Sequence, residues 1–252
     1  MIRLQGLSRR YSTARGTVTA VDDVTLEVTD GETCVLLGPS GCGKTTTLRM
    51  INRLVLPSSG KIFIAGRDTD GIDPVELRRG IGYVIQQIGL FPNMTVAENI
   101  AFPLREAGER EPKVLREKVR EILDVVELEG QEEKMPVSLS GGMKKRVGLA
   151  RSIIRRPKCV LYDEPTSGLD PVVSDSINRL IRRLQERFGM TSIVVTHDMK
   201  SAFDVADHIA YLHEGRIYFY GTPIQLQQTS DPILQDFLLG RSAEERGSKV
   251  ES

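Results

Sequence analysis

Several residue types and patterns are scarce in this chain, and each absence excludes a class of protein. There is no tryptophan, and there are three cysteines, Cys34, Cys42 and Cys159. Their number is odd and their spacing is not that of metal ligands, so we expect reduced thiols rather than a disulfide framework or a zinc site. No apolar run approaches the ~18 residues of a membrane-spanning helix, and residues 1–4 lack a signal-peptide core. We therefore expect the chain to stay in the cytosol.

The chain also lacks an excess of charge of either sign. Its 34 basic and 34 acidic residues cancel, which leaves no overall electrostatic footprint for nucleic acid. We therefore expect neither DNA nor RNA as a substrate. A length of 252 residues, with 40% hydrophobic residues, suits one large α/β domain with a core of ordinary size.

A glycine-rich loop is the strongest motif present. Residues 38–45 fit the pattern G-x-x-x-x-G-K-[ST] and lie between an apolar strand at 33–37 and a helix at 46–54. Such a loop aims backbone N–H groups at the phosphates of a nucleoside triphosphate, while Lys44 reaches the outer phosphates and the Thr45 hydroxyl ligates Mg²⁺. The helix that starts here adds its positive dipole end. The expected contact residues are Gly38, Pro39, Ser40, Gly41, Cys42, Gly43, Lys44, Thr45 and Thr46.

Two adjacent carboxylates follow a second apolar strand. Asp163 and Glu164 come directly after residues 160–162, so both emerge at the carboxyl end of a strand, where α/β proteins hold their ligands. We expect Asp163 to bind Mg²⁺ through its outer shell and Glu164 to orient and deprotonate the attacking water. The alternative is a pair of surface acids at a strand end.

Two further polar side chains end strands of the same sheet. His197 follows the strand at 192–196, where its imidazole can donate a hydrogen bond to the γ-phosphate. Gln86 follows the strand at 83–85, and its amide can contact both Mg²⁺ and the attacking water. The adjacent Gln87 is the alternative for this role, and we choose Gln86. The predicted catalytic residues are thus Glu164, His197, Gln86 and Lys44.

A second phosphate-binding element is predicted at residues 139–142. Ser140 can cap the helix that follows, while Gly141 and Gly142 expose backbone N–H groups to an anion. One nucleotide already enclosed by the first loop has little need of this element, so we infer that it serves the nucleotide of a partner subunit. The alternative is an ordinary capped helix, which the basic run at 144–146 would not contradict.

The remaining pattern predicts the organisation of the fold. Residues 18–28 alternate as antiparallel strands do, and residues 86–154 are mainly helical. Within that region Leu115, Val119, Ile122 and Val126 form one apolar stripe. Apolar strands at 160–162 and 192–195 alternate with helices, which predicts a mainly parallel sheet. Residues 209–212 and 216–220 read as a hairpin, and the tail from 242 is charged.

Together, residues 38–45, Gln86, 139–142, 160–164, 167–170 and His197 resemble the ATPase subunit of an ABC transporter. The resemblance implies an α/β fold: a P-loop (RecA-like) ATPase core, an N-terminal antiparallel β subdomain and an inserted α-helical subdomain at about 87–155. The ATPase domain would cover 1–240, followed by a polar tail at 241–252. It also implies a head-to-tail homodimer, with Tyr11 stacking on adenine and Asp170 acting across the dimer. The family's usual Gln after the glycines is Met143 here.

The transported substrate depends on resemblance alone. Residues 99–106, 139–151 and 162–171 are similar to the ATPase of Mce/Mla-type phospholipid transporters, as are 231–238 and 240. Residues 50–54 and 82–92 instead resemble ATPases of glycine betaine, choline or carnitine importers. Those usually carry a paired regulatory domain after the ATPase, for which the sequence has no room, so we favour lipid transport. That implies a permease, a lipid-binding ring protein, a small regulatory subunit, and a peripheral location on the cytoplasmic face of the bacterial inner membrane.

Two further hypotheses accompany this interpretation. One is a soluble ABC protein that acts on ribosomes or DNA, but such proteins usually have two ATPase units or a long coiled-coil insertion, and neither is seen in the sequence. The other concerns the Cys42 thiol, which lies in the phosphate loop. Its alkylation would crowd the phosphates and inhibit hydrolysis, unless the thiol is inert.

Overall fold

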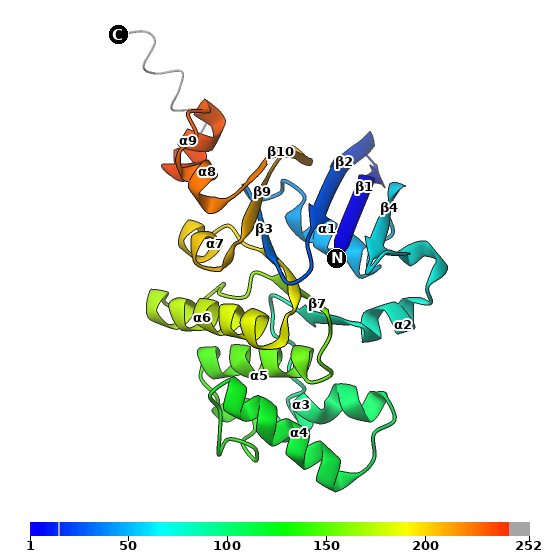
Figure 1. The fold of residues 1–252 in the computed structure, drawn as a ribbon, viewed down its shortest axis with the longest axis vertical. Coiled ribbons are helices and arrows are strands. Elements are labelled where there is room, and N and C mark those ends of the chain that lie inside the picture. Colours follow the sequence, from blue (N-terminus) through cyan, green and yellow to red (C-terminus); the bar gives the residue numbers. More distant parts are fainter. Residues whose placement is uncertain (15, 242–252) are drawn as a thin grey trace.

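The computed structural model describes residues 1–14 and 16–241, which fold around two β-sheets (Figure 1). The strands are β1 (Ile2–Thr13), β2 (Gly16–Val28), β3 (Thr33–Leu37), β4 (Ser59–Ile64), β5 (Arg67–Asp68), β6 (Ile81–Val84), β7 (Cys159–Asp163), β8 (Thr191–Val195), β9 (His208–His213) and β10 (Arg216–Gly221). The helices are α1 (Lys44–Ile51), α2 (Pro74–Arg79), α3 (Val96–Glu106), α4 (Pro112–Val125), α5 (Gly141–Ile153), α6 (Pro171–Phe188), α7 (Met199–Val205), α8 (Pro223–Gln227) and α9 (Pro232–Leu238), with single 3-10 turns at Thr69–Gly71 and Pro136–Ser138.

The larger sheet has six strands in the order β10-β9-β3-β8-β7-β6. Five of them run parallel, and β10 pairs antiparallel with β9 as the predicted hairpin. Every residue of β3, β7 and β8 is buried, as expected of strands covered on both faces. The parallel pairing brings the carboxyl ends of these three strands to one edge of the sheet, where Leu36 and Asp163 both pair with Val195.

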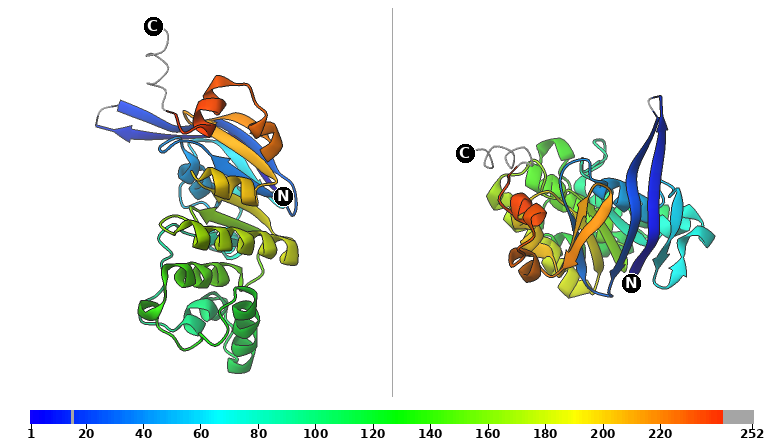
Figure 2. Two further views of the ribbon diagram at one scale, coloured as in Figure 1. Left: turned by 90° about the vertical axis from the view of Figure 1, so that its left-hand side faces the viewer. Right: turned by 90° about the horizontal axis from the view of Figure 1, so that it is seen from above.

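The smaller sheet is antiparallel, in the order β2-β1-β4-β5. Its β1–β2 hairpin projects from the rest of the molecule (Figure 2). The base of this sheet packs against α1 and one face of the larger sheet in a shared hydrophobic core, which includes Leu4, Leu26 and Leu48. Residues 2–5 and 24–28 alternate between the core and solvent, because successive strand residues point to opposite faces, whereas the projecting part of the hairpin around Val18 is exposed.

The other face of the larger sheet packs in a second core with α3 to α7. Alternate residues of β3 enter different cores: Val35 and Leu37 lie in this one, whereas Cys34 and Leu36 lie with the antiparallel sheet. A single strand therefore forms part of the wall of both cores.

Helices α3, α4 and α5 gather at the end of the molecule away from the antiparallel sheet (Figure 1). The predicted stripe on α4 is confirmed, since Leu115, Val119 and Ile122 are buried, as is Val126 just after the helix. The mainly helical pattern predicted over 86–154 corresponds to three helices, α3, α4 and α5, joined by loops and a 3-10 turn. No helix within the described residues is long and apolar enough to cross a membrane. Apart from Arg241, the predicted polar tail lies outside the described residues.

Candidate nucleotide-binding site

The glycine-rich loop joins β3 to α1, and two of its glycines are required by the surrounding backbone. Gly38 has φ +146° and Gly43 has φ +105°, both in the region that disfavours other residues. A Cβ atom at Gly38 would overlap the carbonyl oxygen of Leu212, and one at Gly43 would overlap that of Ala20. The loop can therefore turn into the start of α1 only with glycine at these positions.

Lys44 is the first residue of α1, and its side chain folds under the loop. The ammonium donates to the carbonyl oxygens of Gly38 at 2.7 Å and Pro39 at 2.9 Å. Lys44 is 7% exposed, so its charge lies inside the turn rather than in bulk solvent. A buried ammonium beside the first N–H groups of a helix forms a positive site that fits the phosphates of a nucleotide.

A cavity of about 420 Å³ opens above this loop. It brings together residues from four predicted elements: the loop and the segments that follow β6, β7 and β8. Its lining residues are Ala20, Ser40, Gly41, Gly43, Lys44, Thr45, Thr46, Gln86, Glu164 and His197. Gln86 lines the cavity, whereas the alternative, Gln87, is not among its lining residues.

Thr45 and Asp163 form the part of the site that suits a divalent cation. The Thr45 hydroxyl donates to Asp163 Oδ1 at 2.9 Å, and Asp163 is 2% exposed at the end of β7. Hydroxyl, carboxylate and amide oxygens are the ligand types that Mg²⁺ takes, together with phosphate oxygens and water. Within the described residues no three His, Cys, Asp or Glu side chains are placed so that they could hold a metal ion by themselves. The donor set therefore fits Mg²⁺ held beside a phosphate better than a metal enclosed by protein alone.

Glu164 occupies a strained position beside the cavity. Its φ is +50°, in the left-handed region that a residue other than glycine adopts at a cost of about 1–3 kcal/mol and mainly at functional sites. The backbone N–H donates to Val195 O at 2.9 Å, and His197 Nδ1 donates to Glu164 Oε1, also at 2.9 Å. This leaves the second carboxylate oxygen of Glu164 available to accept a proton. With Nδ1 as the donor, the other ring nitrogen of His197 donates to a phosphate oxygen only when the imidazole is doubly protonated, so the predicted γ-phosphate contact stays a prediction.

Lys145 is a residue of this site that the sequence analysis did not identify. It lies on α5 with 4% exposure, and its ammonium donates to the carbonyl oxygens of Gln86 at 3.0 Å and Glu164 at 3.4 Å. Burial lowers the pKa of Lys145, and the Glu164 carboxylate partly opposes that shift. The sequence does contain a pattern that indicates burial of Lys145, because Lys145 precedes the buried Leu149 by one helical turn and therefore lies on the same face of α5.

The predicted second phosphate element lies away from the cavity. Ser140 caps α5, and its hydroxyl accepts a hydrogen bond from Met143 N at 3.3 Å. Ser140 and Gly141 are exposed, and neither they nor Gly142 line the nucleotide cavity of their own chain. A single chain therefore does not bring the two phosphate elements together, and the role of residues 140–142 stays a prediction.

Tyr11 and Asp170 are also outside the cavity. Tyr11 lies on the β1–β2 hairpin opposite Val18, with the Arg9 guanidinium 4.4 Å from the centre of its ring. Asp170 is exposed and caps α6, where Oδ1 accepts from the N–H groups of residues 172 and 173, each at 3.0 Å. The contacts predicted for these two residues, with adenine and across a dimer, stay predictions.

All three cysteines are free and buried, which confirms the prediction of reduced thiols. Cys42 is 6% exposed. Burial raises the pKa of the Cys42 thiol, and the nearby Lys44 ammonium only partly opposes the shift. Because the reactive form is the thiolate, this environment favours the inert alternative over ready alkylation.

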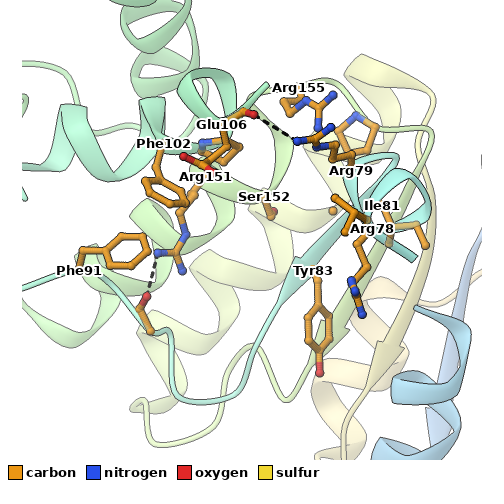
Figure 3. A pocket seen from close by; sticks show the side chains of 15 residues that line it. Arg78, Arg79, Ile81, Tyr83, Phe91, Phe102, Glu106, Arg151, Ser152 and Arg155 are labelled. Atoms are coloured by element: carbon orange, nitrogen blue, oxygen red, sulfur yellow. Dashed lines mark hydrogen bonds between the residues drawn. The ribbon is translucent and has the colours of Figure 1, made fainter. Parts of the chain in front are cut away.

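A separate groove of about 450 Å³ lies between the core and the helical region (Figure 3). Four arginines line it: Arg78 and Arg79 of α2, Arg151 of α5, and Arg155 just after α5, with Glu106 as the one acidic lining residue. Aromatic rings supply apolar surface among these charges, as where the Arg151 guanidinium lies 5.7 Å from the centre of the Phe91 ring. The groove is therefore both aromatic and strongly positive.

Comparison with known proteins shows to which family this fold belongs. The ABC transporter family model matches residues 21–167. The chain is 44% identical over 243 residues to the choline transport ATP-binding protein OpuBA of Bacillus subtilis, covering 94% of this chain and 62% of that protein. It is 43% identical over 229 residues to the osmoprotectant import ATP-binding protein OsmV of Salmonella typhimurium, covering 90% and 60%. The chain thus spans about 60% of the length of these curated relatives.

A solved structure shows the same fold. The ATP-binding cassette MJ0796, captured as a dimer in a post-hydrolysis state bound to ADP and Pi, superposes with a TM-score of 0.80 at 33% identity, over 88% of this chain and 99% of that one. This confirms the predicted α/β P-loop ATPase core with an antiparallel β subdomain and a helical insertion. It also confirms the prediction of an ABC ATPase domain. The narrower resemblance to Mce/Mla-type transporters finds no counterpart in these relatives, which match the alternative group.

Proposed function

Because this chain belongs to the ABC transporter family, we propose that it is an ATP-hydrolysing subunit that energises import of a quaternary amine through a membrane permease. One observation carries the ATPase assignment: a single cavity gathers Lys44, Thr45, Gln86, Glu164 and His197. These residues supply phosphate binding, oxygen ligands for a cation, and a base, the set of parts that phosphoryl transfer to water requires.

The positions of these residues support a separate role for each in ATP hydrolysis. Lys44 and the loop N–H groups bind the outer phosphates, and Mg²⁺, where bound by Thr45, Gln86 and Asp163, would supply positive charge to phosphate oxygens. Glu164 accepts a proton from water as the water oxygen bonds to the γ-phosphorus and the bond to the β,γ-bridging oxygen breaks. His197 holds the Glu164 carboxylate through Nδ1 at 2.9 Å. The products are ADP and phosphate, and Glu164 returns its proton to solvent.

A second copy of the chain completes the proposed site. Ser140 and the two following residues present a capped helix start outside their own cavity, as a group would that binds the partner's γ-phosphate. The dimeric state of the similar MJ0796 cassette supports a pairing of two copies. ATP would close the head-to-tail pair and hydrolysis would reopen it.

The aromatic and positive groove of Figure 3 is the proposed contact with the permease. It lies beside residues 88–95, where we expect membrane-embedded helices to connect with the ATPase, and it joins the core to the helical region. Its four arginines against one glutamate favour a segment of the permease with acidic residues. This contact would hold the chain at the cytoplasmic face of the membrane.

The names of the relatives support a quaternary amine as the substrate, since OpuBA is a choline transport protein and OsmV an osmoprotectant import protein. Phospholipid remains the second candidate, on the sequence resemblance of residues 99–106 and 139–151. We make no proposal of a ring protein or regulatory subunit, because neither relative supports one.

The test is to purify the chain in complex with its permease and to reconstitute the complex in liposomes. We expect ATP-dependent uptake of radiolabelled choline or glycine betaine that is lost in a Glu164→Gln complex. ATP-dependent movement of a fluorescent phospholipid, with no amine uptake, would instead establish the lipid candidate. Absence of ATP hydrolysis by the intact complex would overturn the proposed ATPase.

A further inference from the structure

The Lys145 ammonium lies at the junction of three chain segments. Its own helix, α5, belongs to the helical region, while its two acceptors are backbone carbonyls 59 residues earlier and 19 residues later in the chain. Those carbonyls belong to Gln86 and Glu164, which follow β6 and β7 and line the nucleotide cavity. One side chain therefore bonds to the backbone of both residues that are expected to handle the attacking water.

Burying the positive charge of Lys145 does not by itself stabilise the fold. Lys145 is 4% exposed, so its ammonium loses most of its hydration, and two neutral carbonyl acceptors and the nearby Glu164 carboxylate compensate for that loss only in part. The adjacent Arg146 shows the ordinary alternative, because it pairs with the Glu127 carboxylate at 2.7 Å and its partner is half exposed. An apolar side chain of similar length at position 145 would avoid the desolvation penalty of the cation, but it would leave the carbonyls of Gln86 and Glu164 without this donor, so the effect of the cation is to hold those two backbone groups.

The contacts of Glu164 show what holding its backbone can do. The backbone of Glu164 is held on both sides of the residue: its N–H group donates to Val195 O at 2.9 Å, and its carbonyl oxygen accepts from Lys145. With φ at +50°, small rotations of this strained residue would swing its carboxylate away from the cavity. Lys145 opposes such rotation and ties Glu164 to the backbone of Gln86.

We propose that Lys145 is a positioning residue for ATP hydrolysis, which fixes Gln86 and Glu164 relative to each other by bonding both backbones. The inference rests on the proposed ATPase function. It assigns Lys145 no contact with nucleotide, so the side chain should influence the rate of the chemical step and leave nucleotide binding largely unchanged.

The experiment compares Lys145→Met, Lys145→Arg and the wild-type chain, each assembled with the permease. Lys118→Met, which removes an exposed lysine of α4, is the matched control. We expect Lys145→Met to lower kcat about 10- to 100-fold, the range found when groups that orient a site's direct ligands are removed. The Kd of a non-hydrolysable ATP analogue, measured by calorimetry, should change less than about twofold, and the thermal midpoint should fall by no more than about 4 °C. Lys145→Arg, which keeps a cation able to donate to both carbonyls, should retain more activity than Lys145→Met.

Two results would overturn the inference. One is a wild-type kcat in Lys145→Met. The other is a loss of activity matched by lower thermal stability and weaker analogue binding, which would make Lys145 a packing residue. Glu164→Gln, assayed in parallel, distinguishes failure of this inference from failure of the proposed function. Full ATPase activity in Glu164→Gln would refute the proposed function itself. An inactive Glu164→Gln together with a fully active Lys145→Met would refute only the role proposed for Lys145.

Discussion

Asp207 anchors the strand that presents the phosphate loop, and its replacement by Asn should destabilise the fold. One carboxylate oxygen accepts from Thr33 N at 2.7 Å, at the first residue of β3, and from Gln185 Nε2 at 2.7 Å. The other accepts from Arg182 Nη1 at 2.8 Å. The side chain is 28% exposed, so it ties β3, α6 and the start of β9 together in a largely dry environment.

The magnitude follows from the number of donors. An amide offers one acceptor oxygen where the carboxylate has two, and its NH₂ group would face a donor, so Asp207→Asn loses one or two charge-assisted hydrogen bonds. Each is worth about 1.5–3 kcal/mol, and partial exposure reduces the sum, so we expect a loss of about 2–3 kcal/mol in the free energy of unfolding at pH 7. That is a large part of the ~5–15 kcal/mol typical of a folded domain.

The same contacts give the pH dependence. Burial alone would raise the pKa of Asp207, but hydrogen bonds from Thr33, Arg182 and Gln185 outweigh it and hold the pKa below its ordinary value. A carboxyl whose pKa is lower in the folded state stabilises the fold above its unfolded pKa of about 3.9, and this contribution is lost as pH falls through the folded pKa. The difference between wild type and Asp207→Asn should therefore be constant from about pH 8 to pH 5 and shrink only below about pH 4.

Urea unfolding followed by circular dichroism measures both effects. Asp70→Asn, at an exposed aspartate, is the control and should lie within about 0.5 kcal/mol of wild type. A loss below about 0.5 kcal/mol for Asp207→Asn at pH 7, or a difference that grows on acidification, would refute the argument.

Four further predictions follow from the site and the core. Glu164→Gln should lower kcat for ATP hydrolysis by about 10²- to 10⁴-fold while nucleotide still binds, as a removed general base does, and steady-state kinetics with calorimetry would show it. Lys44→Ala should weaken ATP binding by about 10- to 100-fold in calorimetry, because a charged donor to phosphate is lost, and unchanged affinity would contradict the loop assignment. Leu123→Ala, at a fully buried position of α4, should cost about 2–5 kcal/mol in urea unfolding. Native protein should react with a thiol reagent far more slowly than urea-unfolded protein, because Cys42 is buried and its pKa raised, and equal rates would disprove it.

Much of the site could be predicted because its residues stand where strands end. Lys44 and Thr45 follow β3, Glu164 follows β7 and His197 follows β8, and parallel strands bring their carboxyl ends to one edge. Gln86 was found in the same way, although the sequence could not decide between it and its neighbour. The spacing of motifs along the chain thus becomes proximity in space through sheet topology alone.

Residues whose role depends on packing were harder to predict. Lys145 is one of three consecutive basic residues, and only the rotation of α5 shows which of them is buried. Helix α2 was not predicted from the apolar pattern, although Asp73 caps it and Pro74 occupies its first turn, a recognisable start signal. The partner of residues 140–142 cannot be read from one chain, because the contact would form between two. The transported substrate was harder still, since the residues of the ATPase site handle phosphate and water.

Strand β3 contributes side chains to both hydrophobic cores, and this affects how the domain unfolds locally in solution. Cys34 and Leu36 are locked into one core, and Val35 and Leu37 into the other, so loosening either core leaves the strand held by the second. Amide protons of β3 should then exchange with deuterium only when the domain unfolds globally, among the slowest in the chain. The nucleotide loop is therefore attached to the part of the protein that fluctuates least, and it can ease around its ligand while its point of attachment stays fixed.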